Sequence, residues 1–296
     1  MKACLIFNPT AHGDRAARLR KRLDELRPHC QLRPTVGPGT AGPLAGQAVA
    51  EGCEVIIAAG GDGTVNEVLN GIAQAKRGLL KTRLAVIPLG TANVFAEEIR
   101  MPKSIARVWD IIRQGQEISV DVGQADYVFR NQPIRRLFLQ LAGAGIDSRA
   151  IDLLNWEHKR RWGKLAYVSA ALRSLLTIPA SIQISTEGGL QTAEQVLIGN
   201  GRFYGGRFLL FPNADLQDGR LDATLFARVT WLSLLRGSWG LISSQLYTSG
   251  GLKHLHSNHL CLSSSTPVPF HLDGDNVGQL PVTFSIHSEQ VRIVVP

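Results

Sequence analysis

The stretch with the clearest chemical content is Gly60-Gly61-Asp62-Gly63-Thr64. Glycines allow positive φ and a close approach of the backbone to a ligand, so such a turn suits phosphate groups. Asp62 puts a carboxylate at its centre, and a carboxylate repels phosphates unless a cation lies between them. The turn therefore favours a metal–nucleotide complex. The alternative, that Asp62 is only a helix-capping acid, stays open at this point.

The residues on either side predict how this turn is held. The apolar run 55–59 is typical of a strand buried on both faces. After the turn, apolar residues recur at helical spacing and form one stripe, which consists of Val65, Val68, Leu69 and Ile72. Strand, glycine turn and helix in this order place the turn at the carboxyl end of a parallel strand, where open α/β sheets bind ligands. The first N–H groups of the helix would face the phosphates.

The surrounding chain predicts two domains of different class. Up to about residue 118, strands and helices alternate, which indicates an α/β domain with a parallel sheet. The expected strands are 2–7, 31–36, 55–59 and 83–87, and the expected helices are 14–27, 41–51, 65–75 and one ending near 113. From 119 to 287 short strand-like runs separated by turns predict a mostly antiparallel β-sandwich. Residues 288–296 could complete the first domain.

Two helical insertions are expected within the second domain, at 151–176 and 230–247. The first carries Trp156 and Trp162 among basic residues, a composition that suits a membrane interface. The alternative is that both helices cover the sandwich.

The segment GGDGTVNEVLNG resembles the nucleotide-binding signature of diacylglycerol-kinase-like lipid kinases, which include diacylglycerol, sphingosine and ceramide kinases. Its GGDGT core is shared with NAD kinases and phosphofructokinases, and the NEVLNG tail is more specific. NPTAHG, which begins at Asn8, resembles the family's first nucleotide motif, and Thr35 matches a threonine that touches the nucleotide. GTANVFA resembles a second signature, with Val94 in place of the family's Asp, which leaves the acceptor open.

Further matches continue in order to residue 275. LAGAGIDSRA, with Asp147, resembles a Gly-rich segment of the family, and the stretch that begins GNGRFYGG and ends DGRLD resembles its longest motif. LDGD near the end resembles Asp-Gly-Glu, with Asp275 in the position of the Glu.

The resemblance implies residue roles for phosphoryl transfer from ATP. Asp62 would serve the metal network and Asp275 would be the general base, one methylene shorter than the usual Glu. From its spacing alone, Asp275 could equally be a turn residue. The residues implied to bind the nucleotide are Asn8, Thr35, Gly61, Asp62, Gly63, Thr64, Asn66, Glu67, Gly90, Thr91 and Asn93.

A structural Mg²⁺ is also implied by the resemblance, in the segment 215–220. Its ligands would be the Asp218 side chain and the carbonyl groups of Asp215 and Arg220. Oxygen ligands suit Mg²⁺, although the same spacing would also make a plain turn.

The charge and composition of the chain indicate which classes of partner it could bind. The 296-residue chain has a formal net charge of +8 and a pI near 9.6, which suits an anionic membrane surface, nucleic acid or a phosphorylated substrate. Nucleic acid is the weakest of these because no nucleic-acid motif is present. The four cysteines, scattered without metal-ligand spacing, fit a reducing cytosol. No stretch is long and apolar enough for a membrane span or a signal peptide.

The resemblance, together with these features of composition, implies an ATP- and Mg²⁺-dependent lipid kinase of the bacterial type. It would phosphorylate a hydroxyl group of a diacylglycerol-like or sphingoid lipid at the cytoplasmic face of the inner membrane, as a peripheral protein. A NAD kinase and a nucleotide-binding regulator without catalysis are the alternatives, and a homodimer is one option for the oligomeric state.

Overall fold

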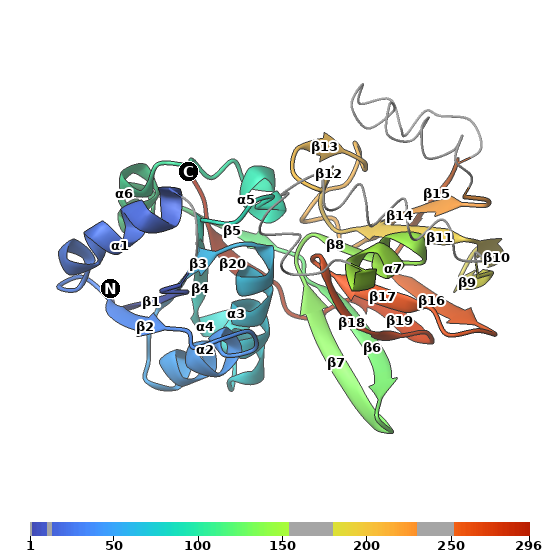
Figure 1. Ribbon diagram of the computed structural model, residues 1–296, viewed down its shortest axis with the longest axis horizontal. Coiled ribbons are helices and arrows are strands. Elements are labelled where there is room, and N and C mark those ends of the chain that lie inside the picture. The colour runs from blue at the N-terminus through green and yellow to red at the C-terminus, as the bar shows by residue number, and fades with distance from the viewer. Residues whose placement is uncertain (1, 11–13, 154–179, 230–251) are drawn as a thin grey trace. The chain divides into compact units, whose positions relative to one another are not determined.

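A computed structural model describes residues 2–10, 14–153, 180–229 and 252–296 of the chain. The described residues form two compact units, Met1–Val122 with Ser288–Pro296, and Gly123–His287. The predicted insertions 151–176 and 230–247 lie outside the described residues, apart from the first few residues of the former. Figure 1 labels the elements.

The first unit is built on a six-stranded sheet in the order β2-β1-β3-β4-β20-β5. Strands β1 to β4 and β20 run parallel, and β5 runs antiparallel to β20 at one edge. β1 and β3 are buried along their whole length, which is why their sequences are continuous apolar runs. The strands are β1 (Ala3–Phe7), β2 (Gln31–Pro34), β3 (Val55–Gly60), β4 (Arg83–Pro88), β5 (Glu117–Val120) and β20 (Val291–Val294).

Helices cover both faces of this sheet, with α1 and α6 on one side and α2, α3 and α4 on the other (Figure 1). This division follows from right-handed crossovers in a sheet whose order reverses at β1. The helices are α1 (Asp14–Leu26), α2 (Ala41–Ala50), α3 (Asp62–Gln74), α4 (Gly78–Lys81), α5 (Val94–Glu98) and α6 (Ile105–Gln114).

Helix α3 begins three residues earlier than expected from the sequence. Its N-cap is Gly61, in an extended conformation, and Asp62 is the first helical residue. Asp62, Gly63 and Thr64 therefore form the first turn of the helix, where they had been expected in a loop. Glycine and aspartate are tolerated there because the first turn's N–H groups have no intrahelical acceptor in any case. The reading of Asp62 as the N-cap is wrong.

The second unit is an antiparallel sandwich. One sheet has the order β10-β9-β16-β19-β6-β7 and the other has the order β15-β14-β11-β8-β17-β18. Its core is mostly aliphatic, with Phe138, Phe270 and Phe284 in edge-to-face contacts. The strands are β6 (Gly123–Phe129), β7 (Gln132–Phe138), β8 (Leu141–Ala144), β9 (Ile182–Thr186), β10 (Gly189–Ala193), β11 (Gln195–Gly199), β14 (Leu221–Phe226), β15 (Leu252–Ser257), β16 (His259–Ser264), β17 (Pro269–Leu272), β18 (Asp275–Gln279) and β19 (Val282–Ile286).

Three shorter elements complete the described part of this unit. They are helix α7 (Ile146–Leu153) and the small hairpin of β12 (Phe203–Tyr204) and β13 (Phe208–Leu209). The predicted fold class, a mostly parallel α/β sheet followed by an antiparallel sandwich, is confirmed. Helix α7 begins five residues before the helix expected from Ile151.

The buried cysteines have no ionised thiol at neutral pH. Cys4 lies inside β1, and burial raises the pKa of its thiol to about 12. Burial likewise raises the pKa of the Cys30 thiol, to about 11. A thiol is nucleophilic only as the thiolate, so both side chains serve the core.

Helices α2 and α3 pack so closely that Gly71→Ala should destabilise the protein. A Cβ at Gly71 would lie 2.1 Å from the carbonyl oxygen of Gly42, a backbone atom that cannot move alone. Overpacking of this kind costs roughly 1–3 kcal/mol. We expect a lower midpoint in urea unfolding for Gly71→Ala. Gly37→Ala is the matched control, because a Cβ there meets no atom within 4 Å, and equal midpoints for the two variants would contradict the prediction.

Candidate functional site

The register of the parallel sheet brings the predicted nucleotide-binding loops to one edge. Phe7 lies beside both Pro34 and Ala59, and Gly60 lies beside Pro88. The residues that follow these strands therefore share the carboxyl edge of the sheet, where α/β folds bind ligands. They include the predicted residues Asn8, Thr35, Gly61 and Gly90.

Glycines allow the loops after β3 and β4 to touch. A Cβ on Gly90 would lie 2.5 Å from the Cα of Gly61, so no larger residue fits at Gly90 without separating the loops. The Leu89 N–H donates to the carbonyl oxygen of Gly60 at 2.9 Å. We call this pair of loops, 60–64 and 89–93, the glycine cradle. Its glycines, Gly60, Gly61, Gly63 and Gly90, would let backbone N–H groups approach a phosphate closely.

The second loop of the cradle is closed by Asn93. This buried residue takes a left-handed conformation at φ 51°, its Oδ1 accepts the Gly90 N–H at 2.7 Å, and its Nδ2 donates to the Gly90 carbonyl at 2.6 Å. Arg15 of α1 adds a bond from Nη1 to the Pro88 carbonyl at 3.0 Å. Asn93 thus shapes the loop, while Thr91 is exposed at its surface.

Asp62 links the first loop of the cradle to α5, the helix that follows the second loop. Its Oδ1 accepts the Phe95 N–H of α5 at 3.3 Å, so the carboxylate lies between the first turns of α3 and α5. Both helix ends favour negative charge. The half-buried carboxylate and the bare glycine backbone around it make a donor set of oxygen atoms and N–H groups, which fits a Mg²⁺–phosphate group.

Other residues predicted to bind the nucleotide have contacts inside the protein. The Glu67 carboxylate accepts the N–H groups of Gly39 at 2.7 Å and Ala41 at 2.9 Å, and so ties the loop after β2 to α3. Asn66 is buried and accepts two hydrogen bonds from Nδ2 of Asn70. Asn8, an exposed residue directly after β1, accepts the Thr10 N–H at 2.9 Å. Their nucleotide contacts stay a prediction.

In the second unit, the turn between β17 and β18 carries two aspartates with different surroundings. Asp275, the predicted base, is exposed at the start of β18. Asp273 has a left-handed conformation at φ 47°, and its carboxylate accepts three backbone N–H groups at 2.9 to 3.0 Å, those of Leu139, Gln140 and Leu141. Asp273 therefore anchors the turn to the start of β8.

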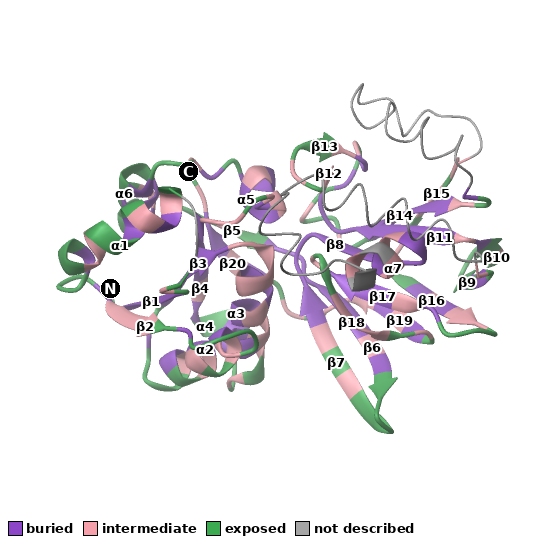
Figure 2. Cartoon of the chain, in the orientation of Figure 1, coloured by how far each residue is buried: buried purple, intermediate pink, exposed green. Residues whose placement is uncertain are grey.

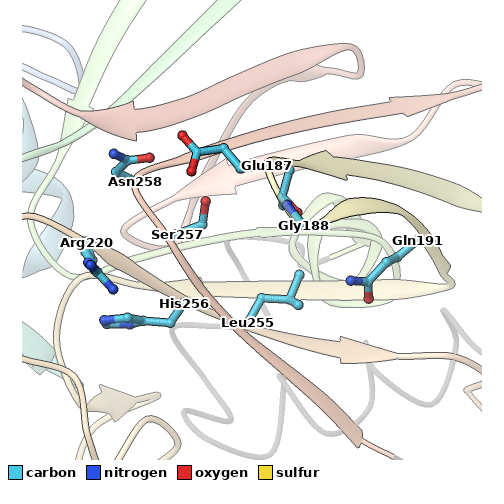
Figure 3. Close-up of a pocket in the computed structure, with 9 residues that line it drawn as sticks. Glu187, Gly188, Gln191, Arg220, Leu255, His256, Ser257 and Asn258 are labelled. Atoms are coloured by element: carbon cyan, nitrogen blue, oxygen red, sulfur yellow. The ribbon is translucent and has the colours of Figure 1, made fainter.

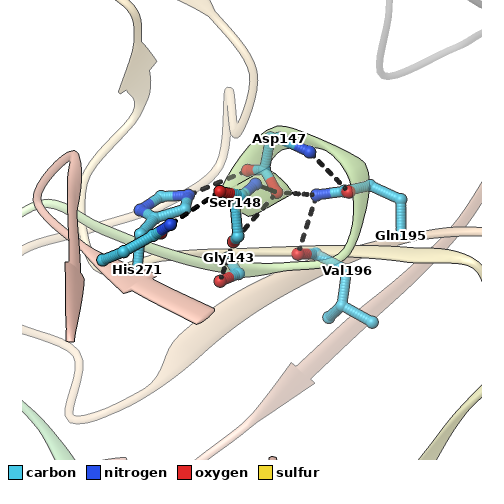
Figure 4. A network of polar contacts seen from close by, with 7 residues as sticks. Gly143, Asp147, Ser148, Gln195, Val196 and His271 are labelled. Carbon is cyan, nitrogen blue, oxygen red and sulfur yellow. Dashed lines mark hydrogen bonds and ion pairs between the residues drawn. The ribbon is translucent and has the colours of Figure 1, made fainter. Parts of the chain in front are cut away.

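A buried polar network joins α7 to β11, β17 and β18; Figure 4 shows its residues on α7, β11 and β17. Asp147, on α7, contacts Nε2 of His271 through Oδ2 at 2.8 Å and accepts Nε2 of Gln195 through Oδ1 at 2.6 Å. His271 is 2% exposed. The Asn276 Nδ2 donates to the Ser148 carbonyl at 2.6 Å and connects α7 to β18. The network thus holds the strand that begins with Asp275.

Sequence reasoning missed Asp273 and His271. The Asp273-Gly274 pair was visible as a turn signal, but its three acceptor bonds depend on residues more than 130 positions earlier. His271 is an isolated histidine in a strand, and its partner is 124 positions away. No local pattern indicates such a pairing.

The segment predicted to hold a structural Mg²⁺ forms two tight side-chain-to-backbone turns. Asp215 Oδ1 accepts the Gln217 N–H at 3.0 Å, and Asp218 Oδ1 accepts the Arg220 N–H at 2.9 Å. These bonds hold the two carboxylates in place. Among the described residues, no three His, Cys, Asp or Glu side chains gather in a way that could hold a metal, so a cation here would depend on backbone carbonyl groups, an oxygen set that fits Mg²⁺.

His256 lies beside this segment, with Nε2 3.6 Å from Asp218 and Nδ1 3.5 Å from Asp222. Burial raises the pKa of the Asp222 carboxyl group, and the nearby His256 partly offsets this rise. Arg220 and His256 also line a cavity of about 360 Å³ between the ends of β15 and the β9–β10 turn (Figure 3).

Within the described residues, no helix is long and apolar enough to cross a membrane. The two insertions with tryptophans, on which the membrane-contact prediction was based, lie outside that part of the chain.

Comparisons with known proteins match both units. The diacylglycerol kinase catalytic domain matches residues 2–125, and the YegS C-terminal NAD kinase beta sandwich-like domain matches residues 140–295. Diacylglycerol kinase of Bacillus subtilis (strain 168) is 26% identical over all of this chain and 96% of its own length. Diacylglycerol kinase of Staphylococcus aureus (strain MRSA252) is 27% identical over all of this chain and 92% of its own.

A solved structure gives the same result. The crystal structure of a diacylglycerol kinase from Bacillus anthracis str. Sterne superposes with a TM-score of 0.76 at 25% identity, covering 100% of this chain and 97% of that one. The two family matches cover both units, and the relatives cover the whole chain. This protein therefore belongs to the diacylglycerol kinase catalytic domain family and is a lipid kinase of its bacterial type.

Proposed function

We propose that this protein transfers the γ-phosphate of ATP, with Mg²⁺, to a hydroxyl group of a diacylglycerol-like or sphingoid lipid at a membrane surface. The observation that carries this proposal is the glycine cradle, with Asp62 between the first turns of two helices. Backbone N–H groups of Gly61 and Gly63 would bind phosphate oxygens, Thr64 and Thr91 could add hydroxyl donors, and Gly90 would let the second loop approach closely. Asn8 and Thr35, at the same sheet edge, would contact the rest of the nucleotide.

The proton of the acceptor hydroxyl would pass to the Asp275 carboxylate while the hydroxyl oxygen bonds to the γ-phosphorus and ADP leaves. Phosphoryl transfer needs positioning and charge neutralisation more than covalent chemistry from the protein. Bound Mg²⁺ supplies the neutralisation of the phosphate charge. Asp62 would hold the Mg²⁺ beside the phosphates, and Asp273 would fix the turn that carries Asp275.

The test is transfer of labelled γ-phosphate from ATP and Mg²⁺ to single acceptors in mixed micelles. The panel is diacylglycerol, phosphatidylglycerol, ceramide, sphingosine and, as a soluble acceptor, NAD. Label in one lipid supports the proposal and names the acceptor. Label in NAD alone would replace it with the NAD kinase function, which shares the GGDGT core, and no label in any acceptor would favour a regulator.

Asp62→Asn tests the role of charge in the cradle. The asparagine Oδ1 can still accept the Phe95 N–H, so the loops should keep their geometry. We expect kcat to fall by roughly 10²–10³, the usual cost of removing one group that stabilises transition-state charge. Asp14→Asn, an exposed acid at the start of α1, is the control and should keep full activity. Equal kcat values for both variants would exclude Asp62 from the chemistry.

A further inference from the structure

The hairpin of β6 and β7 ends in an unusual exposed tip. The strands pair from Gly123↔Phe138 to Phe129↔Gln132, and Arg130 and Asn131 form the turn, both with positive φ. β7 is the outermost strand of its sheet, and Figure 1 shows the two strands extending beyond the other strands of that sheet. Among the described strands, none therefore covers the tip, residues 128–131.

Burial changes abruptly along β6. Tyr127 is 8% exposed, whereas the next two side chains, Val128 and Phe129, are 62% and 47% exposed. Figure 2 shows the same change from buried to exposed towards the end of the hairpin. Successive residues of a strand point to opposite faces, so both faces of the tip present a large apolar side chain. Among the described residues, these are the only exposed large apolar residues adjacent in sequence.

The tip is also basic. The hairpin contains three arginines and one aspartate, and that aspartate, Asp126, is paired with Arg135 at 2.8 Å. The Arg130 guanidinium lies 5.3 Å from the centre of the Phe129 ring. An aromatic ring with a cation beside it suits the boundary between acyl chains and anionic headgroups, because the ring enters the apolar layer and the cation stays with the phosphates.

A second copy of the chain is a less suitable occupant. Pairing at the edge of β7 would need free backbone N–H groups and a flat, uncharged strand. Pro133 has no N–H, and Arg135 is exposed on the same strand. Charge complementarity instead favours an anionic surface, because the hairpin and the whole chain, at +8, are both positive.

We infer that the β6–β7 tip docks the protein on anionic membranes by inserting Phe129 and Val128 into the lipid interface. This inference rests on the proposed function only in so far as the substrate is a lipid. The tip holds the enzyme at the surface where the lipid substrate lies, and it takes no part in the chemistry.

The experiment is sedimentation with phosphatidylcholine vesicles that contain or lack phosphatidylglycerol. The double variant V128S/F129S should bind the anionic vesicles about tenfold more weakly than the unsubstituted protein, which corresponds to about 1.4 kcal/mol. Arg130→Gln should weaken binding less, and mainly at low salt. Leu190→Ser, which removes another exposed apolar side chain of the same unit, is the matched control and should leave binding unchanged.

Three outcomes would overturn the inference. They are absence of vesicle binding by the unsubstituted protein, equal binding by the double variant, and a change from dimer to monomer in the double variant with vesicle binding intact. The variant Phe129→Trp gives an independent reading, because brominated lipids should quench its added fluorescence, and no added quenching would also contradict docking.

Vesicle binding is measured without ATP and does not depend on catalysis. The docking inference can therefore fail while the kinase proposal holds, and the kinase proposal can fail while docking holds. An activity assay with a short-chain diacylglycerol, kept below its critical micelle concentration, separates catalysis from membrane docking. The double variant should phosphorylate this dispersed lipid as well as the unsubstituted protein does, and should lose activity only on vesicles.

Discussion

Asp275→Asn should lower kcat for lipid phosphorylation by about 10²–10⁴, the range that a positioned general base contributes. Asparagine has nearly the same shape but cannot accept the hydroxyl proton at neutral pH. Asp275 is exposed at the start of β18, so the substitution should change the free energy of unfolding by no more than about 0.5 kcal/mol. The measurement is the initial rate with the lipid identified by the acceptor panel, together with a urea unfolding curve.

Asp275→Glu is the matched control for this substitution. It restores the carboxylate on a side chain one methylene longer, and it should keep activity within about tenfold of the unsubstituted protein. If Asp275→Asn phosphorylates the lipid at an unchanged rate, Asp275 is not the base. A loss of activity accompanied by unfolding would instead assign it a structural role.

Asp273→Ala should have the largest effect on stability, about 3 kcal/mol. The substitution leaves three backbone N–H groups, those of residues 139 to 141, without their acceptor, and buried unpaired donors are costly. Alanine also tolerates the left-handed conformation of this position poorly. The urea midpoint should fall, and activity should fall with it because the Asp275 turn loses its anchor.

Asp273→Asn separates these two causes. Asparagine adopts the left-handed conformation readily, and its Oδ1 can keep the bonds from Gln140 and Leu141. We therefore expect a smaller loss than for Asp273→Ala, about 2 kcal/mol, since one hydrogen bond to a charged group is lost. If Asp273→Ala unfolds at the same urea concentration as the unsubstituted protein, the three bonds do not hold the turn.

Local patterns were sufficient for the class of fold. The apolar runs at β1, β3 and β4 and the stripe on α3 are periodic signals that depend only on neighbours within a few residues, and the α/β prediction based on them is confirmed. The start of α3 was misjudged because glycines and an aspartate look like a loop, although the first turn of a helix tolerates them.

The candidate site was only partly visible in the sequence. The glycine cradle could be proposed because both loops follow strands directly, and strands of a parallel sheet end at one edge. The contact between Gly61 and Gly90, in contrast, depends on β3 and β4 being neighbours in the sheet. Glu67 was predicted as a ligand, and only the fold showed that its carboxylate is bound by the N–H groups of Gly39 and Ala41.

The sequence by itself determined the two domains' classes and the order of the motifs, and it predicted the chemistry of the carboxylates. The tertiary structure decided which carboxylate holds the β17–β18 turn, that Asp147 meets His271 across 124 positions, and that Val128 and Phe129 stay exposed at a hairpin tip. The physical reason is that helical and strand periodicity is encoded within a few residues, whereas hydrogen-bond partners and burial depend on which strands become neighbours and in which register.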